Sequence, residues 1–377
     1  MDFSFSDEQK DLRELARQIL EDKVSNERLK QVEAQDEIFD ADLWQELARS
    51  NLLGAALPEA FGGTGFGYFE LCLLLQEIGR TVAPVPAYAS LVLGALPLAE
   101  FGSDAQKREW LPRVVDGSAV LSAGLVELEA DDPMDPATTA KRDGDGWRLE
   151  GRKSLVPAGL RAARILVPAR SDDGRIGVFL VDPESAGVER TPQQCTDRQP
   201  YCQLALSGTA VTEQDLVGDL DRGSEILAWL LDRATVGLCA VQLGVSERAL
   251  EMTAAYTSER RQFDRPVGSF QAVHQRAADA YVNVEAMRLT TWETAWRLAQ
   301  GKNADEAIAI AKYMAADGGH FVAYAAQHLH GGIGIDVDYS LHRYWSWTTQ
   351  IEHTLGSGRA QIARLGARLA KRGMPAA

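Results

Sequence analysis

A glycine-rich run between residues 63 and 67 is the first segment whose composition could do chemistry. It reads G-T-G-F-G, and runs of this kind can wrap a nucleotide phosphate. A dinucleotide-binding loop needs a β-strand immediately before the glycines and a parallel sheet around them. Here L-P-E precedes the run, inside a stretch with helical periodicity. The sequence therefore predicts a loop between helices at this position and not a Rossmann site.

The four cysteines are the other reactive side chains whose spacing is informative. Cys72, Cys195, Cys202 and Cys239 form no C-x-x-C pair and fit no metal-ligand pattern, so no metal site is expected. Free thiols are typical of a reducing compartment. The first residues lack a basic segment followed by an apolar one, and no apolar run approaches the ~20 residues that span a bilayer. We therefore expect a cytoplasmic protein with no membrane partner.

The charge balance narrows the partners further. The 377-residue chain carries 39 basic and 54 acidic side chains, a formal net charge of −15. An excess of negative charge opposes binding to a nucleic-acid backbone or to an anionic membrane, so neither is expected as a partner. The chain is also long for one hydrophobic core, so two or three packed units are expected.

Helical periodicity dominates both ends of the chain. Ser6 stands three residues before Gln9, which is the spacing of a capping box, and a helical apolar stripe follows. Further N-terminal helices are predicted over Leu43–Leu53 and Tyr68–Ile78 and from Ala105 onward. Long C-terminal helices are predicted over Ile226–Ser258, Phe270–Ala299, Ala304–Leu329 and Leu341–Lys371. Helices of that length favour a bundle whose faces also pack against other subunits.

The middle of the chain has the pattern of strands instead. Short apolar runs cover Leu121–Glu127, Trp147–Val156, Ile165–Val167, Ile176–Val181 and Leu204–Val211, with Gly/Asp turn clusters between them. This spacing favours an antiparallel barrel or sandwich. The predicted fold is mainly α with a central antiparallel β domain. We expect an N-terminal helical domain over residues 1–118, a β-barrel domain over 119–220 and a C-terminal four-helix bundle over 221–377.

Several segments, in order and with matching spacing, resemble the acyl-CoA dehydrogenase family. They are Leu57–Gly65, Arg260–Phe263 followed by Gly268–Ala272, the glycine loop His330–Gly334, and the helix from Leu341 onward. The resemblance covers nearly the whole chain. It implies the family's fold, FAD as cofactor, an acyl-CoA substrate oxidised between its α and β carbons, and an electron-transfer flavoprotein as electron acceptor.

A narrower resemblance lies in the end segment from His328 to Tyr344. It is similar to steroid side-chain acyl-CoA dehydrogenase subunits, which work as heterotetramers of two unlike chains. This resemblance implies a bulky substrate of the steroid side-chain type and an unlike dehydrogenase chain as partner.

The resemblance gives three residues after the first long C-terminal helix a role in FAD binding. Arg260 stands three residues before Phe263, as in the family, where such an arginine meets the FAD pyrophosphate. A guanidinium suits that anion. Gln271 stands eight residues after Phe263, again as in the family. The alternatives are a surface charge for Arg260 and a helix cap or cross-link for Gln271.

The glycine loop is the second cofactor segment that the resemblance implies. Gly331 and Gly332 would allow the backbone to approach the cofactor closely. His328 occupies the family's usual Gln position and can still form hydrogen bonds. The alternative for the glycines is an ordinary loop at a helix break.

The catalytic glutamate of the family has no counterpart at its usual position. Counted without gaps from Gly331, that position falls on Leu355, and leucine cannot accept a proton. Glu352 lies three positions earlier and would face a similar side of the helix, with a solvated surface charge as the alternative. Some family members carry the base just before an Arg in the first C-terminal helix. Anchored on Arg233, that residue is Asp232, with an Asp–Arg pair that fixes the helix as the alternative.

The segment that seats the flavin ring in the family is altered as well. The family places Trp-Ile-Thr after G-x-K, whereas here Ser154 is followed by Leu155, Val156 and Pro157. Leu155 offers no aromatic face, and Pro157 has neither a backbone N–H nor a hydroxyl. Where the family has Thr-Glu-Pro, this chain keeps only the glutamate, in the pair Val126-Glu127.

Three hypotheses follow from this sequence. In the leading one, the chain lends its helical edge to the FAD of an unlike catalytic partner, which supplies the ring seat and the carboxylate. The second is a self-sufficient homotetramer in which Asp232 is the base. The third is a flavin-free structural subunit that only stabilises an enzyme partner.

Overall fold

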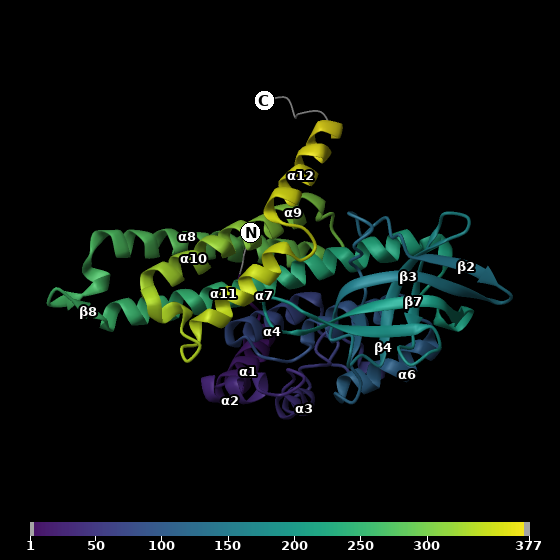
Figure 1. The fold of residues 1–377 in the computed structure, drawn as a ribbon, viewed down its shortest axis with the longest axis horizontal. Coiled ribbons are helices and arrows are strands. Elements are labelled where there is room, and N and C mark those ends of the chain that lie inside the picture. Colours follow the sequence, from purple (N-terminus) through teal and green to yellow (C-terminus); the bar gives the residue numbers. More distant parts are fainter. Residues whose placement is uncertain (1–3, 373–377) are drawn as a thin grey trace. The chain divides into compact units, whose positions relative to one another are not determined.

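The computed structural model describes residues 4–372, and these form two compact units. Within the described residues, the helical unit contains residues 4–31, 68–83 and 235–372, and the strand unit contains residues 32–67 and 84–234. Figure 1 shows helices in the N-terminal and C-terminal parts of the chain and a curled sheet in the middle part. The predicted fold class is confirmed. The predicted three-domain boundaries stay a prediction.

The helical unit begins with a helix whose start the sequence specifies. Helix α1 (Asp7–Lys23) starts at the predicted capping box, in which Ser6 and Gln9 exchange side-chain and backbone hydrogen bonds. Such a box satisfies two N–H groups that a helix end otherwise leaves without partners. Two further helices follow, α2 (Asn26–Glu33) and α4 (Tyr68–Thr81), and the glycine-rich run lies before α4 as a loop with no strand in front of it.

The predicted long C-terminal helices are confirmed for the first three. They are α7 (Gly223–Glu259), α8 (Gln271–Ala299) and a continuous helical run made of α9 (Asp305–Tyr313), the π-helical η6 (Met314–Gly318) and α10 (Gly319–His330). The prediction of one last helix was wrong. It is broken into α11 (Leu341–His353) and α12 (Gly358–Arg372).

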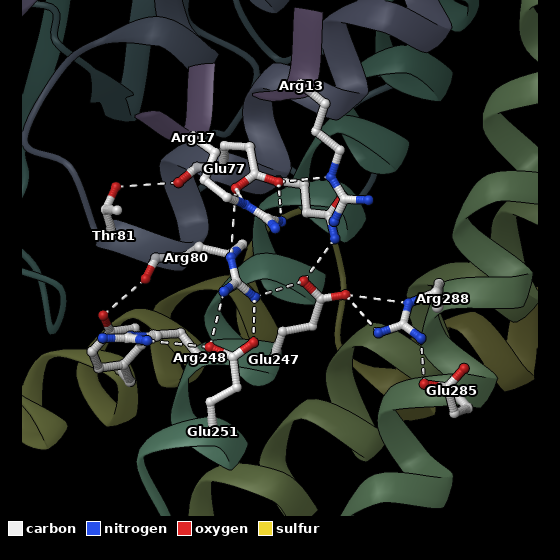
Figure 2. A network of polar contacts seen from close by, with 12 residues as sticks. Arg13, Arg17, Glu77, Arg80, Thr81, Glu247, Arg248, Glu251, Glu285 and Arg288 are labelled. Carbon is white, nitrogen blue, oxygen red and sulfur yellow. Dashed lines mark hydrogen bonds and ion pairs between the residues drawn. The ribbon is translucent and has the colours of Figure 1, made fainter. Parts of the chain in front are cut away.

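A network of buried ion pairs ties four helices of the helical unit together (Figure 2). On α4, Glu77 accepts hydrogen bonds from Arg13 and Arg17 of α1 at 2.8 and 3.0 Å. One turn later, Arg80 donates to Glu247 of α7 at 3.2 Å, and Arg288 of α8 bonds the same carboxylate at 2.8 Å. Glu77 and Glu247 are buried, so these cationic partners compensate for the hydration that each carboxylate loses.

The strand unit contains one sheet together with short helices. The helices are α3 (Ala41–Arg49), α5 (Leu96–Phe101), α6 (Asp104–Val115) and the π-helical η2 (Tyr88–Ala95), with 3₁₀ turns η1 (Glu59–Phe61), η3 (Glu213–Asp215) and η4 (Leu220–Arg222). The strands are β1 (Leu121–Ala123), β2 (Thr139–Asp143), β3 (Gly146–Pro157), β4 (Arg164–Ser171), β5 (Ile176–Val181), β6 (Val188–Gln194) and β7 (Pro200–Thr212).

The sheet runs in the order β1-β4-β2-β3-β7-β6, with β5 also paired to β4. Both β1 and β2 pair with β4 in parallel, so the sheet is mixed and not wholly antiparallel. The sequence shows the hairpins through their Gly/Asp turns, but it carries no local signal for pairing between strands far apart in the chain. Strands β2 and β6 also escaped prediction, because both are largely exposed and polar and lack the apolar runs used to find the others.

One helical stretch has the length and composition of a membrane span. The most apolar 18-residue window within residues 220–259 has a mean hydropathy of 1.5, but 72% of that window is buried within the protein. A core helix of a globular protein meets the same criterion. Burial of this kind is what a core helix shows.

Candidate functional site

The chain between α7 and α8 forms a strained hairpin that displays Phe263. Strands β8 (Arg261–Gln262) and β9 (Arg265–Pro266) pair antiparallel, which leaves Phe263 and Asp264 as a two-residue loop. Their φ angles are +53° and +62°, in the left-handed region that such hairpin loops require and that normally favours Asn and Gly. Phe263 is 87% exposed. Backbone strain that holds an aromatic side chain in solvent indicates a ligand or partner at this tip.

Arg260 and Gln271 stand on either side of this hairpin. The backbone of Arg260 is fixed, since its N–H donates to Tyr256 O at 2.8 Å and its carbonyl accepts from Val267 N at 2.7 Å. Its side chain is exposed. Gln271 is the first residue of α8 and is exposed too. The fold thus presents a guanidinium and an amide from a fixed backbone.

The glycine loop begins where α10 ends, at His330. Gly331 has φ +66° and ψ −143°, and no atom lies within 4 Å of the place where a Cβ would stand on Gly331 or Gly332. The backbone there is open to a ligand. His328, half a turn before the helix end, is exposed.

One ring stack joins the two predicted cofactor segments. His330 lies flat against Tyr256 of α7, with 4.5 Å between ring centroids and 19° between planes. Because Tyr256 precedes Arg260 by one helical turn, the stack brings the start of the hairpin and the start of the glycine loop to one end of the helical unit. The predicted residues Arg260, Phe263, Gln271, His328, Gly331 and Gly332 all lie on these two segments. Sequence reasoning missed Tyr256, although its four-residue spacing from Arg260 on a helix was a usable signal.

The protonation of His330 follows from its neighbours. Nδ1 lies 2.8 Å from the Ala326 carbonyl, which can only accept, so Nδ1 carries the proton. Nε2 then accepts from the Tyr339 hydroxyl at 3.1 Å. Burial lowers the pKa of His330 and outweighs the opposing Ala326 bond, so the ring is neutral near pH 7.

These groups suit the phosphate half of a dinucleotide cofactor. An exposed guanidinium, an open glycine backbone and an exposed aromatic ring meet the needs of a pyrophosphate with an attached base. FAD, the cofactor that the family resemblance implies, therefore fits this end of the helical unit.

The position expected for the family's glutamate lies in the break between α11 and α12. Leu355 has φ +56° and is 9% exposed, and Gly356 has φ +102°. A left-handed pair of residues cannot continue a helix, which is why the predicted single helix is interrupted here. Two buried side chains hold the break: Lys312 Nζ donates to the Ile351 carbonyl, and Gln361 Nε2 donates to Leu355 O at 3.2 Å.

Glu352 is engaged with another side chain of the helical unit. It lies 3.0 Å from His320 Nδ1. The prediction that Glu352 and position 355 share a helix face was wrong, because α11 ends at His353 and position 355 has left-handed backbone.

Asp232 lies half-buried on α7, within the strand unit. Its neighbour Arg233 stacks on Trp229 at 3.6 Å from the ring centroid, and its Nη1 donates to the Trp229 carbonyl at 3.4 Å. Asp232 as the base stays a prediction.

The segment expected to seat the flavin ring forms a bulge in β3. The register with β7 shifts between Lys153 and Val156, and Leu155 has φ +52°. The Leu155 N–H donates to Gln193 Oε1 at 2.7 Å, and the Ser154 N–H donates to Val126 O at 2.8 Å. Both amides are used within the protein, and Leu155 and Pro157 supply neither the aromatic ring nor the hydroxyl that the family has at these positions.

Below that bulge the strand unit buries an ion pair. Glu127 and Lys153 are 7% and 1% exposed, and Lys153 Nζ contacts Glu127 Oε1. Thr138 adds two hydrogen bonds to the same carboxylate, from Oγ1 at 2.6 Å and from N at 3.1 Å. Burial favours the neutral acid, but Lys153 and these donors outweigh it and lower the pKa of Glu127, so the carboxylate stays charged.

The structure offers no metal centre among residues 4–372. No group of three His, Cys, Asp or Glu side chains in that range is placed to hold an ion. The four cysteines are free thiols, as predicted.

Comparison with known proteins matches both ends of the chain to one family. Residues 6–118 match the model of the acyl-CoA dehydrogenase N-terminal domain, and residues 221–370 match that of the C-terminal domain. The chain is 38% identical to acyl-CoA dehydrogenase FadE27 of Mycobacterium tuberculosis, over 98% of this chain and 99% of the relative.

Two solved structures resemble the chain over nearly its whole length. A chain of the ChsE4-ChsE5 complex from Mycobacterium tuberculosis is 38% identical, with a TM-score of 0.94 and full coverage of both chains. A chain from a variant of the Tcur3481-Tcur3483 steroid ACAD is 45% identical, with a TM-score of 0.91, covering 97% of this chain and 98% of that one.

Proposed function

The chain belongs to the acyl-CoA dehydrogenase family, and from this premise we propose that it is a subunit of a heteromeric dehydrogenase that lends its FAD-binding helices to an unlike catalytic partner. Members of the family are oxidoreductases that act on the CH–CH bond of acyl-CoA thioesters with FAD. The unlike partner would supply the flavin-ring seat and the catalytic carboxylate. This chain would supply the residues that bind the phosphate half of the cofactor.

The proposal rests on one difference between the two segments expected to bind FAD: the polar groups of the first are exposed, and those of the second are hydrogen-bonded within the protein. At the end of the helical unit, Arg260 and Phe263 are exposed and the backbone of Gly331 is open. In the β3 bulge, the amides of Ser154 and Leu155 are already hydrogen-bonded inside the protein. A chain that can hold one half of a cofactor and not the other fits a shared site.

The chemistry of such a site divides between the chains. When bound, FAD accepts the hydride that leaves the β carbon of the acyl group. Arg260 would pair with the pyrophosphate, the Gly331 and Gly332 backbone would approach it closely, and Phe263 would cover part of the cofactor. Position 355 of this chain cannot accept the α proton, because its side chain is leucine. The α proton would pass to a carboxylate of the partner.

The relatives support an unlike partner and a bulky substrate. One similar structure is a complex of two named chains, ChsE4 and ChsE5, and another is described as a steroid ACAD. We therefore propose a heterotetramer acting on a steroid side-chain type of acyl-CoA, with an electron-transfer flavoprotein as acceptor. The free cysteines support a cytoplasmic location.

The test is to count FAD in the chain expressed alone and in the chain co-expressed with an unlike dehydrogenase chain. We expect a colourless lone chain and about one FAD per pair of unlike chains in the complex. One tightly bound FAD per copy of the lone chain would refute the shared site. The family assignment would stand in either case.

The self-sufficient homotetramer remains the second candidate, because Asp232 sits on α7 beside an arginine as in some family members. Under that hypothesis the lone chain reduces an electron acceptor with acyl-CoA, and Asp232→Asn abolishes the reaction. Under the shared-site proposal, Asp232→Asn changes the turnover of the complex by less than about twofold, because the partner provides the base.

A further inference from the structure

The glycine loop and the segment after it turn apolar side chains outward. Ile333, Ile335 and Val337 are 40%, 75% and 67% exposed. Exposed side chains gain little hydrophobic stabilisation, so Ile335 and Val337 do not hold residues 331–340 against the rest of the chain. Hydrogen bonds inside the segment, from Asp336 N to Ile333 O at 3.2 Å and from Tyr339 N to Asp336 O at 3.1 Å, shape its turns. Polar contacts at its two ends join it to the neighbouring helices.

The first end is held within the C-terminal helices. His330 accepts a hydrogen bond from Tyr339 at 3.1 Å and stacks on Tyr256. This contact closes residues 331–338 into a loop whose ends are adjacent, but it leaves the path of the chain beyond Tyr339 open.

The second end is held by a residue from the N-terminal part of the sequence. Asn26, the first residue of α2, donates from Nδ2 to the Asp338 carbonyl at 3.0 Å. Its Oδ1 accepts from Ser340 Oγ at 2.9 Å and from Arg343 Nη1 at 2.8 Å. One amide thus bonds three residues around the junction between the loop and α11.

Of the three hydrogen bonds that anchor this segment to Asn26, the one with Arg343 matters most. Arg343 is 5% exposed, and a buried guanidinium needs acceptors to compensate for lost hydration. Lys30 of the same helix also reaches this region, through an ion pair with the Asp338 side chain. Those two side chains are 40% and 79% exposed, and exposed pairs contribute little.

We propose that Asn26 is a positioning residue for the cofactor edge, holding the glycine loop in the shape that receives the cofactor phosphates. The identity of that ligand rests on the function proposed above. The anchor itself does not, since it is a property of the loop in this chain. Asn26 acts through the loop and does not touch the cofactor.

Three variants test the role of Asn26. Asn26→Ala removes all three hydrogen bonds but leaves the start of α2 capped by Ser25, whose Oγ accepts from Arg28 N at 3.1 Å. Asn26→Asp keeps an acceptor for Ser340 and Arg343, so it serves as the conservative rescue. Lys30→Ala is the matched control, because it removes the other α2 contact with Asp338.

The first measurement is hydrogen exchange of residues 331–340 in the lone chain, which needs no cofactor. We expect about tenfold faster exchange in Asn26→Ala, near-normal exchange in Asn26→Asp and no change in Lys30→Ala. Unchanged exchange in Asn26→Ala would overturn the anchor. If that variant does not fold, Ser340→Ala, which removes one of the three bonds, is measured instead. Faster exchange would then support the anchor, and unchanged exchange would overturn it.

The second measurement is the rate of FAD release, followed by flavin fluorescence, from whichever preparation carries flavin. We expect about tenfold faster release from Asn26→Ala, restored to within about twofold by Asn26→Asp. Faster exchange without faster release would reduce Asn26 to a structural contact and refute its positioning role. A flavin-binding lone chain would refute the shared site while leaving both readings of Asn26 intact.

Discussion

The end of the helical unit and the bulge in β3 use their polar groups in opposite ways. Around Arg260 and Gly331, side chains and backbone face outward, and Phe263 is held in solvent on a strained turn. Around Leu155, the backbone amides are bonded to Gln193 and Val126, and the side chains below support the sheet. One region leaves its polar groups exposed, while the other uses them in hydrogen bonds within the fold.

Each of the two units also buries a lysine, with a different partner. Lys153 of the strand unit contacts the carboxylate of Glu127, so its charge is neutralised. Lys312 of the helical unit is fully buried and donates to the Ile351 carbonyl. A neutral carbonyl oxygen compensates for the lost hydration of a buried ammonium group less well than a charged carboxylate does. Substitutions in the two regions should therefore separate effects on stability from effects on the cofactor.

The largest effect is expected at the buried pair of the strand unit. Lys153→Met leaves Glu127 buried without its cationic partner, and breaking such pairs costs about 3–5 kcal/mol. We expect a large fall in the denaturant midpoint of the complex, whereas Lys141→Met on the exposed face of β2 should stay within about 0.5 kcal/mol. Release of FAD by a still-folded Lys153→Met variant would show that this region serves the cofactor directly, against the comparison drawn here.

The second effect is a pH dependence that arises from Lys312. Burial lowers its pKa from 10.5 to about 8, partly opposed by Cys239 and Glu352. Between these pH values the unfolded chain binds a proton that the folded chain has lost, so this group makes stability rise with pH from about 8 to about 10.5.

The measurement is the free energy of unfolding of the wild-type chain and of Lys312→Met as a function of pH. The advantage of Lys312→Met below pH 8 should shrink by up to about 3 kcal/mol as the pH approaches 10.5. Lys302→Met, at an exposed site, should run parallel to wild type. A pH-independent difference between Lys312→Met and wild type would mean that the lysine is not strained by burial.

At Arg260 we expect the smallest change in stability, together with a clear loss of FAD affinity. Arg260→Ala removes an exposed guanidinium, so unfolding should change by less than about 0.5 kcal/mol. FAD affinity of the complex should fall about 10- to 100-fold, as for loss of a charge-assisted hydrogen bond. Arg261→Ala, whose side chain donates to the Asp264 carbonyl at 3.1 Å, is the matched control. Undiminished FAD binding by Arg260→Ala would favour the flavin-free structural subunit.

The sequence by itself determined the elements whose signals are local. The capping box at Ser6 and Gln9, three of the long C-terminal helices and the strands that carry apolar runs could all be read from spacing and periodicity. Local backbone preference and side-chain period encode such features directly. The segments around Arg260 and Gly331 were found through the family resemblance, and their role in FAD binding stays a prediction.

Only the tertiary structure decided what depends on distant partners or unusual backbone. The break at Leu355 needs a leucine in the left-handed region, held by Lys312 and Gln361 from other helices. The bonds of Asn26 to the segment after the glycine loop span more than 300 residues of sequence. The free energy of such contacts arises only when folding brings the partners together, so no periodicity along the chain records them.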